Sequence, residues 1–443
     1  MADTRDMPMP GKVGLYCKTS LIVLFGLLLP FAMALANKSA PAVLVAAALA
    51  GAGALAAESS WQEVKASLAA IFSRSIACGV LGFVALGVLS FVWSIDRAQT
   101  WRTLSETVPV LIAGLVVLIA ARRFAEPRDA LWLVIGLCLA AVFIDIEAAT
   151  NMALHHAVHA RDRISDLKPS SDVISMLFWP AAFWLTNRPG ATRRDWIAIG
   201  VFGLFCFVSV VYAGGGTAKF GFGAGLAAFV LSWFWPRVTL AAIAVVGLFL
   251  LVVAPFAGKL GNDIVSTQVQ RWFDHANMHA SERFLIWEVF GADVAFHPLL
   301  GHGFGVSRSI YSAGADSQTV YVSFGGKPTY DFRPHVADVL EWVRTGENGG
   351  RDVPHPHNGF LQIWVESGVL GALVVAALFG LVLRRIAKLR QPALPVAAAI
   401  LATALEICLV GFGIWQAWWI AIVFSAVIWF EIVQPQDAKD EMH

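Results

Sequence analysis

Residues 238–255 read VTLAAIAVVGLFLLVVAP and decide the fold class, because these eighteen residues contain no charged side chain. A helix rises about 1.5 Å per residue, so a block of this length roughly matches the hydrocarbon core of a bilayer. Similar blocks recur along the 443 residues, which are 58% hydrophobic and only 14% charged. Soluble domains carry about 25% charged residues. The sequence therefore predicts an all-α polytopic membrane protein and excludes an ordinary soluble enzyme.

The apolar blocks predict twelve membrane-spanning helices. Seventeen tryptophans are typical of a protein with two interfacial belts. Residues 61–73 are instead amphipathic and are expected to lie on the membrane surface. The twelve predicted spans lie near residues 19–36, 40–57, 74–93, 104–121, 129–150, 171–187, 195–212, 218–235, 238–255, 360–383, 393–411 and 414–432.

Basic side chains concentrate in three short loops, after the fourth, sixth and tenth predicted spans. With an even number of spans, these loops share one side with both termini, and the positive-inside rule makes that side the cytoplasm. The same parity divides the chain into residues 1–255 with nine spans, an external loop subdomain at 256–356, three spans at 357–434 and a cytoplasmic tail at 435–443. The basic residues are Arg122, Arg123, Arg128, Arg188, Arg193, Arg194, Arg384, Arg385, Lys388 and Arg390.

The external segment 256–356 contains no spanning block and is long enough for a small helical subdomain. Amphipathic patterns predict helices near Ile264–Trp272 and Ser281–Val294. The five cysteines all lie in or beside apolar blocks, so no structural disulfide is expected.

Residues 355–371, HPHNGFLQIWVESGVLG, form the entry to the tenth predicted span. Pro356 is tolerated only near a helix start, so His357 and Asn358 are expected at the helix N-terminus on the external side. Gly368 and Gly371 leave one helix face bare for close approach of a neighbour. His357 could accept a proton from a bound hydroxyl group. Alternatively, it is a solvated interfacial histidine next to a helix-capping asparagine.

His357-Asn358, nine residues, and Gly368-x-x-Gly371 together resemble the signature of the O-antigen ligase family. The resemblance implies a GT-C-like glycosyltransferase fold with twelve spans, cytoplasmic termini and one large periplasmic loop between spans nine and ten. It further implies metal-independent, inverting transfer of a glycan from undecaprenyl diphosphate to a sugar hydroxyl of lipid A-core. No cofactor is expected.

A lipid diphosphate leaving group needs fixed positive charge near the membrane surface. Arg283 resembles the family's arginine in the large loop, although it could instead pair with Glu282 or Glu288. Lys219 follows a glycine-rich turn where the family usually carries arginine, and a lysine offers only a point charge to a phosphate. The resemblance thus implies three catalytic residues, His357, Arg283 and Lys219.

Further residues are candidates for substrate binding. Arg161, Arg163 and Lys168 precede the sixth predicted span and could contact phosphate, although internal ion pairs with Asp162 and Asp166 are an alternative. Backbone N–H groups of the glycine turn could bind an anion at a helix start, or the turn could merely connect two spans. No metal site is expected, because the histidine pairs at i and i+4 have no further ligand cluster. The complete set of substrate-binding candidates is Arg161, Arg163, Lys168, Asn358, Gly215 and Gly216.

Three other functions remain open at this stage. An O-antigen or exopolysaccharide polymerase and a protein O-oligosaccharyltransferase share the carrier-linked donor and differ only in the acceptor. A transporter would show inverted repeats and midplane charges, whereas the polar residues here concentrate in one external loop. The leading interpretation is a bacterial inner-membrane enzyme of lipopolysaccharide biosynthesis with its active site on the periplasmic face. Its partners would be the carrier-linked donor, the lipid A-core acceptor and membrane lipids, without nucleic acid.

Overall fold

The computed structural model is helical throughout the part of the chain that it describes, and no strand occurs there. Nine of the described helices are long and apolar enough to cross a membrane. The chain is therefore a polytopic, all-helical membrane protein, as predicted. The described residues are 9–36, 38–73, 75–158, 167–187, 192–213, 215–266, 268–270, 272, 280–310 and 355–434.

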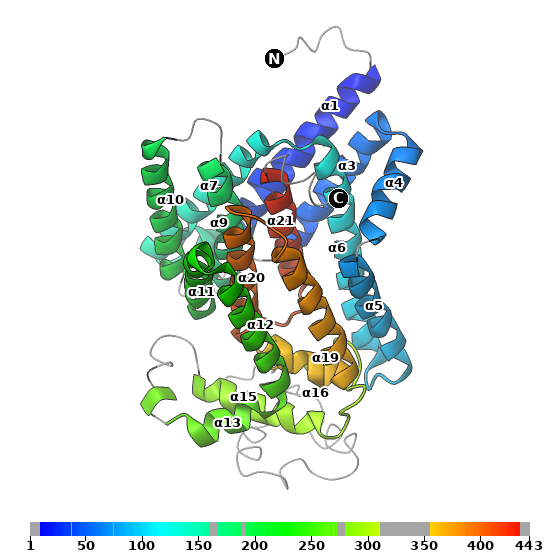
Figure 1. Ribbon diagram of the computed structural model, residues 1–443, viewed down its shortest axis with the longest axis vertical. Coiled ribbons are helices and arrows are strands. Elements are labelled where there is room, and N and C mark those ends of the chain that lie inside the picture. Colours follow the sequence, from blue (N-terminus) through cyan, green and yellow to red (C-terminus); the bar gives the residue numbers. More distant parts are fainter. Residues whose placement is uncertain are drawn as a thin grey trace.

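The first half of the chain forms most of the bundle (Figure 1). Its helices are α1 (Met9–Ile22), η2 (Val23–Leu28), α2 (Leu29–Leu35), α3 (Ala40–Glu58), α4 (Trp61–Phe72), α5 (Ser75–Leu89), η3 (Ser90–Val92), α6 (Arg97–Phe124), η4 (Pro127–Asp129), α7 (Ala130–Ala149), α8 (Ala153–Val158), α9 (Lys168–Asn187), α10 (Arg193–Tyr212), α11 (Gly216–Phe234) and α12 (Pro236–Val253).

The second half adds a layer across one end of the bundle and three further long helices. The layer contains η6 (Ala254–Phe256), α13 (Ala257–Ile264), α15 (Ala280–Val294) and α16 (Ser307–Ile310), and the long helices are α19 (Gly359–Ile386), α20 (Ala393–Val410) and α21 (Ala417–Val433). The prediction for Ser281–Val294 is confirmed by α15. The prediction for Ile264–Trp272 is confirmed in part, because residues 264, 268–270 and 272 are helical, whereas residues 265 and 266 are not.

Each of the twelve predicted spans overlaps a helix, but not every one is apolar and long enough to count as a span by itself. Among the described helices at predicted spans, α9, α10 and α21 do not meet the length and hydropathy expected of a membrane span. Only Trp196–Tyr212 of α10 is apolar, and α21 has 17 residues. Twelve crossings therefore stay a prediction.

Helix α9 forms the centre of the bundle and packs against α7, α10, α11, α20 and α21. Its first two turns carry Ser170, Ser171, Asp172 and Ser175, all of them buried. Polar side chains in a membrane bundle face its interior, where they find partners and avoid lipid. The polar end of α9 therefore reduces its hydropathy and at the same time brings polar groups into the protein interior.

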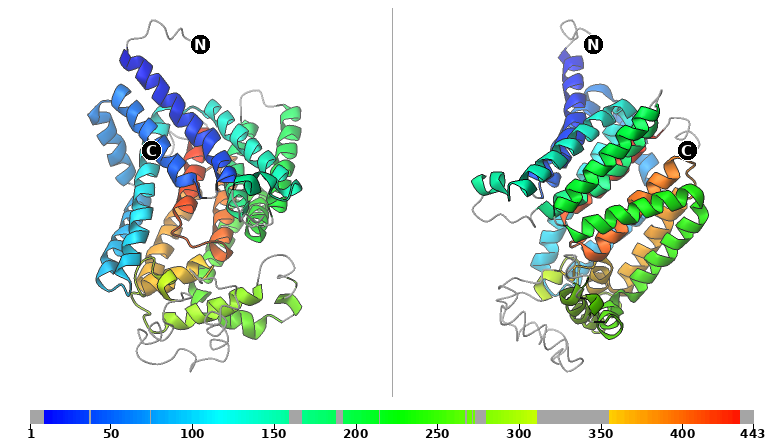
Figure 2. Two further views of the ribbon diagram at one scale, coloured as in Figure 1. Left: turned by 180° about the vertical axis from the view of Figure 1, so that it is seen from behind. Right: turned by 90° about the vertical axis from the view of Figure 1, so that its left-hand side faces the viewer.

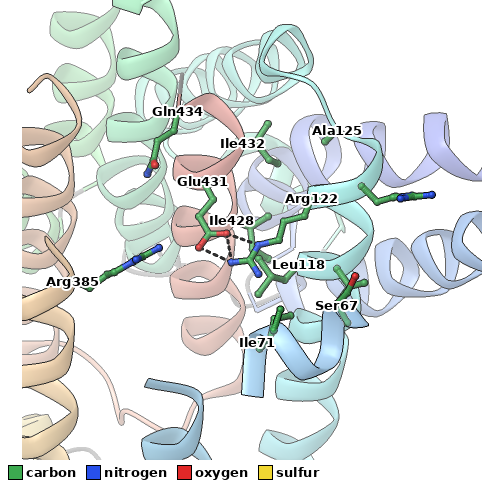
Figure 3. Close-up of a pocket in the computed structure, with 14 residues that line it drawn as sticks. Ser67, Ile71, Leu118, Arg122, Ala125, Arg385, Ile428, Glu431, Ile432 and Gln434 are labelled. Atoms are coloured by element: carbon green, nitrogen blue, oxygen red, sulfur yellow. Dashed lines mark hydrogen bonds and ion pairs between the residues drawn. The ribbon is translucent and has the colours of Figure 1, made fainter. Parts of the chain in front are cut away.

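Two of the three basic loops lie at one end of the molecule, and most of the third, at residues 188–194, lies outside the described residues. The ends of α6, α19 and α21 meet around a cavity of about 310 Å³ whose walls include Arg122, Arg385 and Gln434 (Figure 3). Arg122 donates a forked hydrogen bond to both carboxylate oxygens of Glu431. The layer of α13 and α15 lies at the opposite end in every view (Figures 1 and 2). The loops after the fourth and tenth predicted spans thus share one side.

Candidate functional site

The segment 355–358 lies where α19 begins, beside the end of α20. The side chain of Asn358 accepts a hydrogen bond of 3.1 Å from the Leu361 N–H and so caps α19. A Cβ atom on Gly359 would lie 2.3 Å from Cγ2 of Ile414 and 2.9 Å from the Cys408 carbonyl oxygen. Only glycine permits this approach, and it holds the predicted histidine against the end of α20. The expectation that His357 and Asn358 stand at a helix N-terminus is confirmed.

His357 is half-buried and has a left-handed backbone, with φ at 50°. Its Nδ1 lies 3.2 Å from the carbonyl oxygen of Gly411, just beyond α20. A carbonyl oxygen can only accept, so Nδ1 must carry a proton for this hydrogen bond to form. A neutral His357 ring in this arrangement keeps its lone pair on Nε2.

His355 is a second histidine beside the first, and its role is not visible from the sequence. The two ring centroids are 4.2 Å apart, and the backbone N–H of His357 donates to Nδ1 of His355. Burial lowers the pKa of His355 well below its usual value, and positive charge on His357, Arg308, Lys38 and Arg283 lowers it further. His355 is therefore a neutral ring that supports the backbone of His357.

Three of the predicted cations come together from three different helices. Lys168 begins α9, Lys219 lies in the first turn of α11, and Arg283 lies in the first turn of α15. Arg283 and Lys219 both lie within electrostatic range of Lys168, and Arg283 also acts on His355. The structure thus gathers Lys168, Lys219, Arg283 and His357 near one end of the bundle.

Two carboxylates border this group of cations. Asp172 is 1% exposed, its two oxygens have no hydrogen-bond partner among the described residues, and it acts electrostatically on Lys168. Glu406 of α20 lies within electrostatic range of Asp172 and Arg283. A buried carboxylate without a hydrogen bond is costly unless a nearby cation compensates it. Sequence analysis missed Asp172, because an acid inside a serine-rich helix start resembles an ordinary capping segment.

The glycine turn before α11 brings this helix close to α9. Gly215 and Gly216 are both buried. A Cβ atom on Gly215 would lie 2.9 Å from Oγ of Ser171 and 3.7 Å from Cγ of Lys168. The turn therefore permits Lys168 and Lys219 to approach, and anion binding by its N–H groups stays a prediction. Arg161 and Arg163 lie outside the described residues.

Helix α19 is kinked at Gly368, where φ is 59° and ψ is −156°. The segment that approaches Gly368 is the loop 298–303 rather than another spanning helix. Across the kink, Val369 N–H donates to the Pro298 carbonyl and Leu370 N–H to the Leu299 carbonyl. Gly371 faces Ser367 of its own helix. The expected close approach thus occurs only at Gly368, and it fixes a loop.

The side chain of Glu366 in α19 binds the end of the same loop through hydrogen bonds. This fully buried carboxylate accepts hydrogen bonds from the Gly305 N–H, the Ser307 hydroxyl, the Gln362 amide and the Trp415 indole. Gln362 in turn accepts from the N–H of Ile414, close to the Gly411 carbonyl that contacts His357. The network connects the loop 298–306 to the segment that orients the histidine.

The described residues contain no group of three or more His, Cys, Asp or Glu side chains placed to hold a metal ion. The cavity of Figure 3 contains none of the predicted site residues and lies at the other end of the bundle. The site itself offers the cations Lys168, Lys219 and Arg283, and the histidine His357. This arrangement suits the binding of a phosphate-bearing ligand and proton transfer beside it.

Comparison with known proteins supports this interpretation. A family model described as O-antigen ligase matches residues 201–376. Over these residues the chain is similar to the O-antigen ligase family. A Rickettsia conorii protein named "Putative polysaccharide ligase" is 22% identical over 370 residues, covering 81% of this chain and 79% of that protein. A protein of the same name from Rickettsia felis is 20% identical over 400 residues, covering 86% and 87%.

The match to the O-antigen ligase family includes most of the site. Lys219, Arg283 and His357 lie within residues 201–376, whereas Lys168 and Asp172 of α9 precede them and Glu406 of α20 follows. The function at family level is polysaccharide ligation by a glycosyltransferase-type enzyme.

Proposed function

We propose that the protein is an O-antigen ligase that transfers polysaccharide from undecaprenyl diphosphate to a sugar hydroxyl of lipid A-core, by metal-independent inverting transfer. The observation that carries this proposal is that Lys219 and Arg283 both act electrostatically on Lys168, and that Arg283 also acts on His355, the neighbour of His357. Four residues from four separate segments supply what a lipid diphosphate donor requires. The enzyme would span the bacterial inner membrane twelve times, with this site on the periplasmic face.

The cations act on the leaving group. As the bond between the anomeric carbon and the phosphate oxygen breaks, negative charge grows on the diphosphate. Lys219 and Arg283 would stabilise that charge in a partly buried position, where water screens it less than in bulk. Arg283 can offer two parallel N–H donors to one phosphate, whereas Lys219 provides a point charge.

His357 acts on the acceptor. The sugar hydroxyl attacks the anomeric carbon from the face opposite the diphosphate, which inverts the configuration. The hydroxyl proton passes to Nε2 of His357, because Nδ1 is committed to the Gly411 carbonyl. His355 contributes no proton, since it is buried and neutral. A competing role for His357 is to hydrogen-bond the diphosphate without taking up a proton.

The acceptor distinguishes ligase from polymerase. The names of the Rickettsia relatives specify ligation of a polysaccharide, which favours the ligase. In a deletion strain, we expect loss of polymer-capped lipopolysaccharide together with accumulation of carrier-linked polymer. Capped molecules that carry a single repeat would instead identify a polymerase, and unchanged lipopolysaccharide would contradict both.

His357→Gln tests the base in purified enzyme. Glutamine keeps a hydrogen-bonding group but cannot take up the proton, so transfer should slow by at least about 10²-fold while donor binding persists. His156→Gln changes an exposed histidine of α8 and serves as the matched control. Activity should also survive EDTA. Near-normal transfer by His357→Gln would exclude the base role, and loss with EDTA that a divalent ion restores would exclude the metal-independent mechanism.

A further inference from the structure

Helix α12 exposes one continuous apolar stripe. Val245, Phe249 and Val252 are 68%, 60% and 63% exposed. On a spanning helix such exposure is ordinary, because lipid covers these side chains. The opposite face, which includes Gly247 and Leu251, is buried, and the Leu251 carbonyl accepts a hydrogen bond from the Trp364 indole of α19. The stripe therefore marks the side of α12 that faces the bilayer.

The stripe does not end with α12. It continues through η6 and α13 at helical spacing in Phe256, Leu260 and Ile264, which are 57%, 39% and 73% exposed. The buried face continues as well, through Ala254, Pro255, Gly258 and Gly261. The ninth predicted span ends at residue 255, whereas the apolar helical segment that contains α12 runs on to Ile264, and α13 belongs to the layer across the end of the bundle (Figure 1).

Three different faces run along α13. Its glycine face packs on α15, where Asn262 also contacts Glu288, its apolar stripe is exposed, and a third, polar face carries Lys259 and Asp263. At about 100° per residue, the polar residues lie next to the apolar stripe on the side away from the glycines. Apolar and polar faces side by side are the pattern of a helix that lies in a membrane interface.

We propose that α13 lies in the external interface of the membrane, with Phe256, Leu260 and Ile264 among the lipid acyl chains. The occupant of the stripe is the lipid bilayer, because the stripe is continuous with the lipid-facing side of α12. Lys259 and Asp263 then face the headgroups and water. An apolar surface that covers both a spanning helix and the helix after it needs one apolar environment.

The interfacial position of α13 would be transmitted to Arg283 by close packing. A Cβ atom on Gly258 would lie 2.0 Å from the Glu288 nitrogen, and one on Gly261 would lie 2.4 Å from Cδ1 of Phe284. The amide of Asn262 also donates to Glu288 at 2.8 Å. Phe284 is the residue after Arg283, so α13 sets the height of this cation above the membrane. This consequence rests on the proposed function.

Depth measurements test the membrane contact without any assay of activity. In a full-length, cysteine-free variant, nitroxide labels are placed singly at positions 260, 264, 259 and 263. The protein is reconstituted into vesicles of phosphatidylethanolamine and phosphatidylglycerol. For each label, the collision rate with oxygen is divided by the collision rate with a water-soluble nickel chelate. This ratio should be several-fold higher for labels at 260 and 264 than for labels at 259 and 263. Equal ratios at all four positions would overturn the proposal.

Glycan transfer tests the coupling to Arg283. Leu260→Asn with Ile264→Asn should reduce transfer several-fold, whereas the matched change Lys259→Gln with Asp263→Asn should leave it unchanged. Unfolding temperatures confirm that both double variants are folded. Normal transfer by the first variant would overturn the coupling. Lipid-exposed labels in a protein that transfers no glycan would support the interfacial helix while refuting the proposed function, so the two failures are distinguishable.

Discussion

Replacement of Gly368 by alanine tests the kink that joins α19 to the loop 298–303. Gly368 has a backbone conformation that side chains rarely adopt, with φ at 59° and ψ at −156°. An alanine Cβ there would lie 2.4 Å from the Leu299 carbonyl carbon and 2.6 Å from the Leu300 nitrogen. Both contacts are with backbone, so no side-chain rotation relieves them.

The cost of this substitution has two sources. The disfavoured backbone region costs about 1–3 kcal/mol for a residue with a Cβ atom. Displacing the loop also breaks the hydrogen bonds from Val369 N–H and Leu370 N–H, which contribute about 1 kcal/mol each. The free energy of unfolding should therefore fall by about 3–5 kcal/mol. Transfer should fall too, because Glu366 and Gln362 connect this loop to the segment beside His357.

Gly380→Ala is the matched control in the same helix. A Cβ atom on Gly380 meets nothing within 4 Å. Alanine in a helix interior is about 0.5–1 kcal/mol more favourable than glycine, so this variant should be neutral or slightly more stable. Thermal unfolding in detergent and glycan transfer are measured for both. Equal unfolding temperatures for the two variants would refute the argument that Gly368 is fixed by backbone contact.

Three further predictions follow from the site and the loop that supports it. Lys219→Ala should slow glycan transfer by roughly 10²-fold, whereas Lys219→Arg should keep the normal rate. An unchanged turnover of the alanine variant would exclude Lys219 from the diphosphate site. Glu366→Gln should lower the free energy of unfolding by roughly 2–3 kcal/mol, because the new amide N–H₂ group would point at donors that now bind the carboxylate. An unchanged unfolding temperature would contradict the hydrogen-bond network. Burial lowers the pKa of His302 to about 4, so the folded protein binds fewer protons than the unfolded chain in this pH range. The free energy of unfolding should therefore fall by about 3 kcal/mol as the pH drops from 6.5 to 4. In thermal unfolding, the His302→Gln variant should show a weaker pH dependence.

Much of the site could be predicted because its residues stand in local patterns. His357 and Asn358 follow a proline at the start of an apolar block, and Lys219 follows a run of glycines. Asp172, Glu406 and His355 were not assigned a role in the site, because each is an isolated polar residue whose partners lie far away in sequence. Arg161 and Arg163 lie outside the described residues, so their role stays a prediction.

The sequence by itself determined the class of the fold, since apolar blocks of bilayer length can satisfy their backbone hydrogen bonds in lipid only as helices. It also determined which loops are basic and where the family signature stands. Only the tertiary structure decided that Lys168, Lys219 and Arg283 gather at the end of the bundle where His357 lies, that Gly368 bends α19 around a loop, and that α13 extends the apolar stripe of α12. Hydropathy depends on each segment alone, whereas these features depend on packing between helices that are distant in sequence, and on the glycines that let their backbones meet.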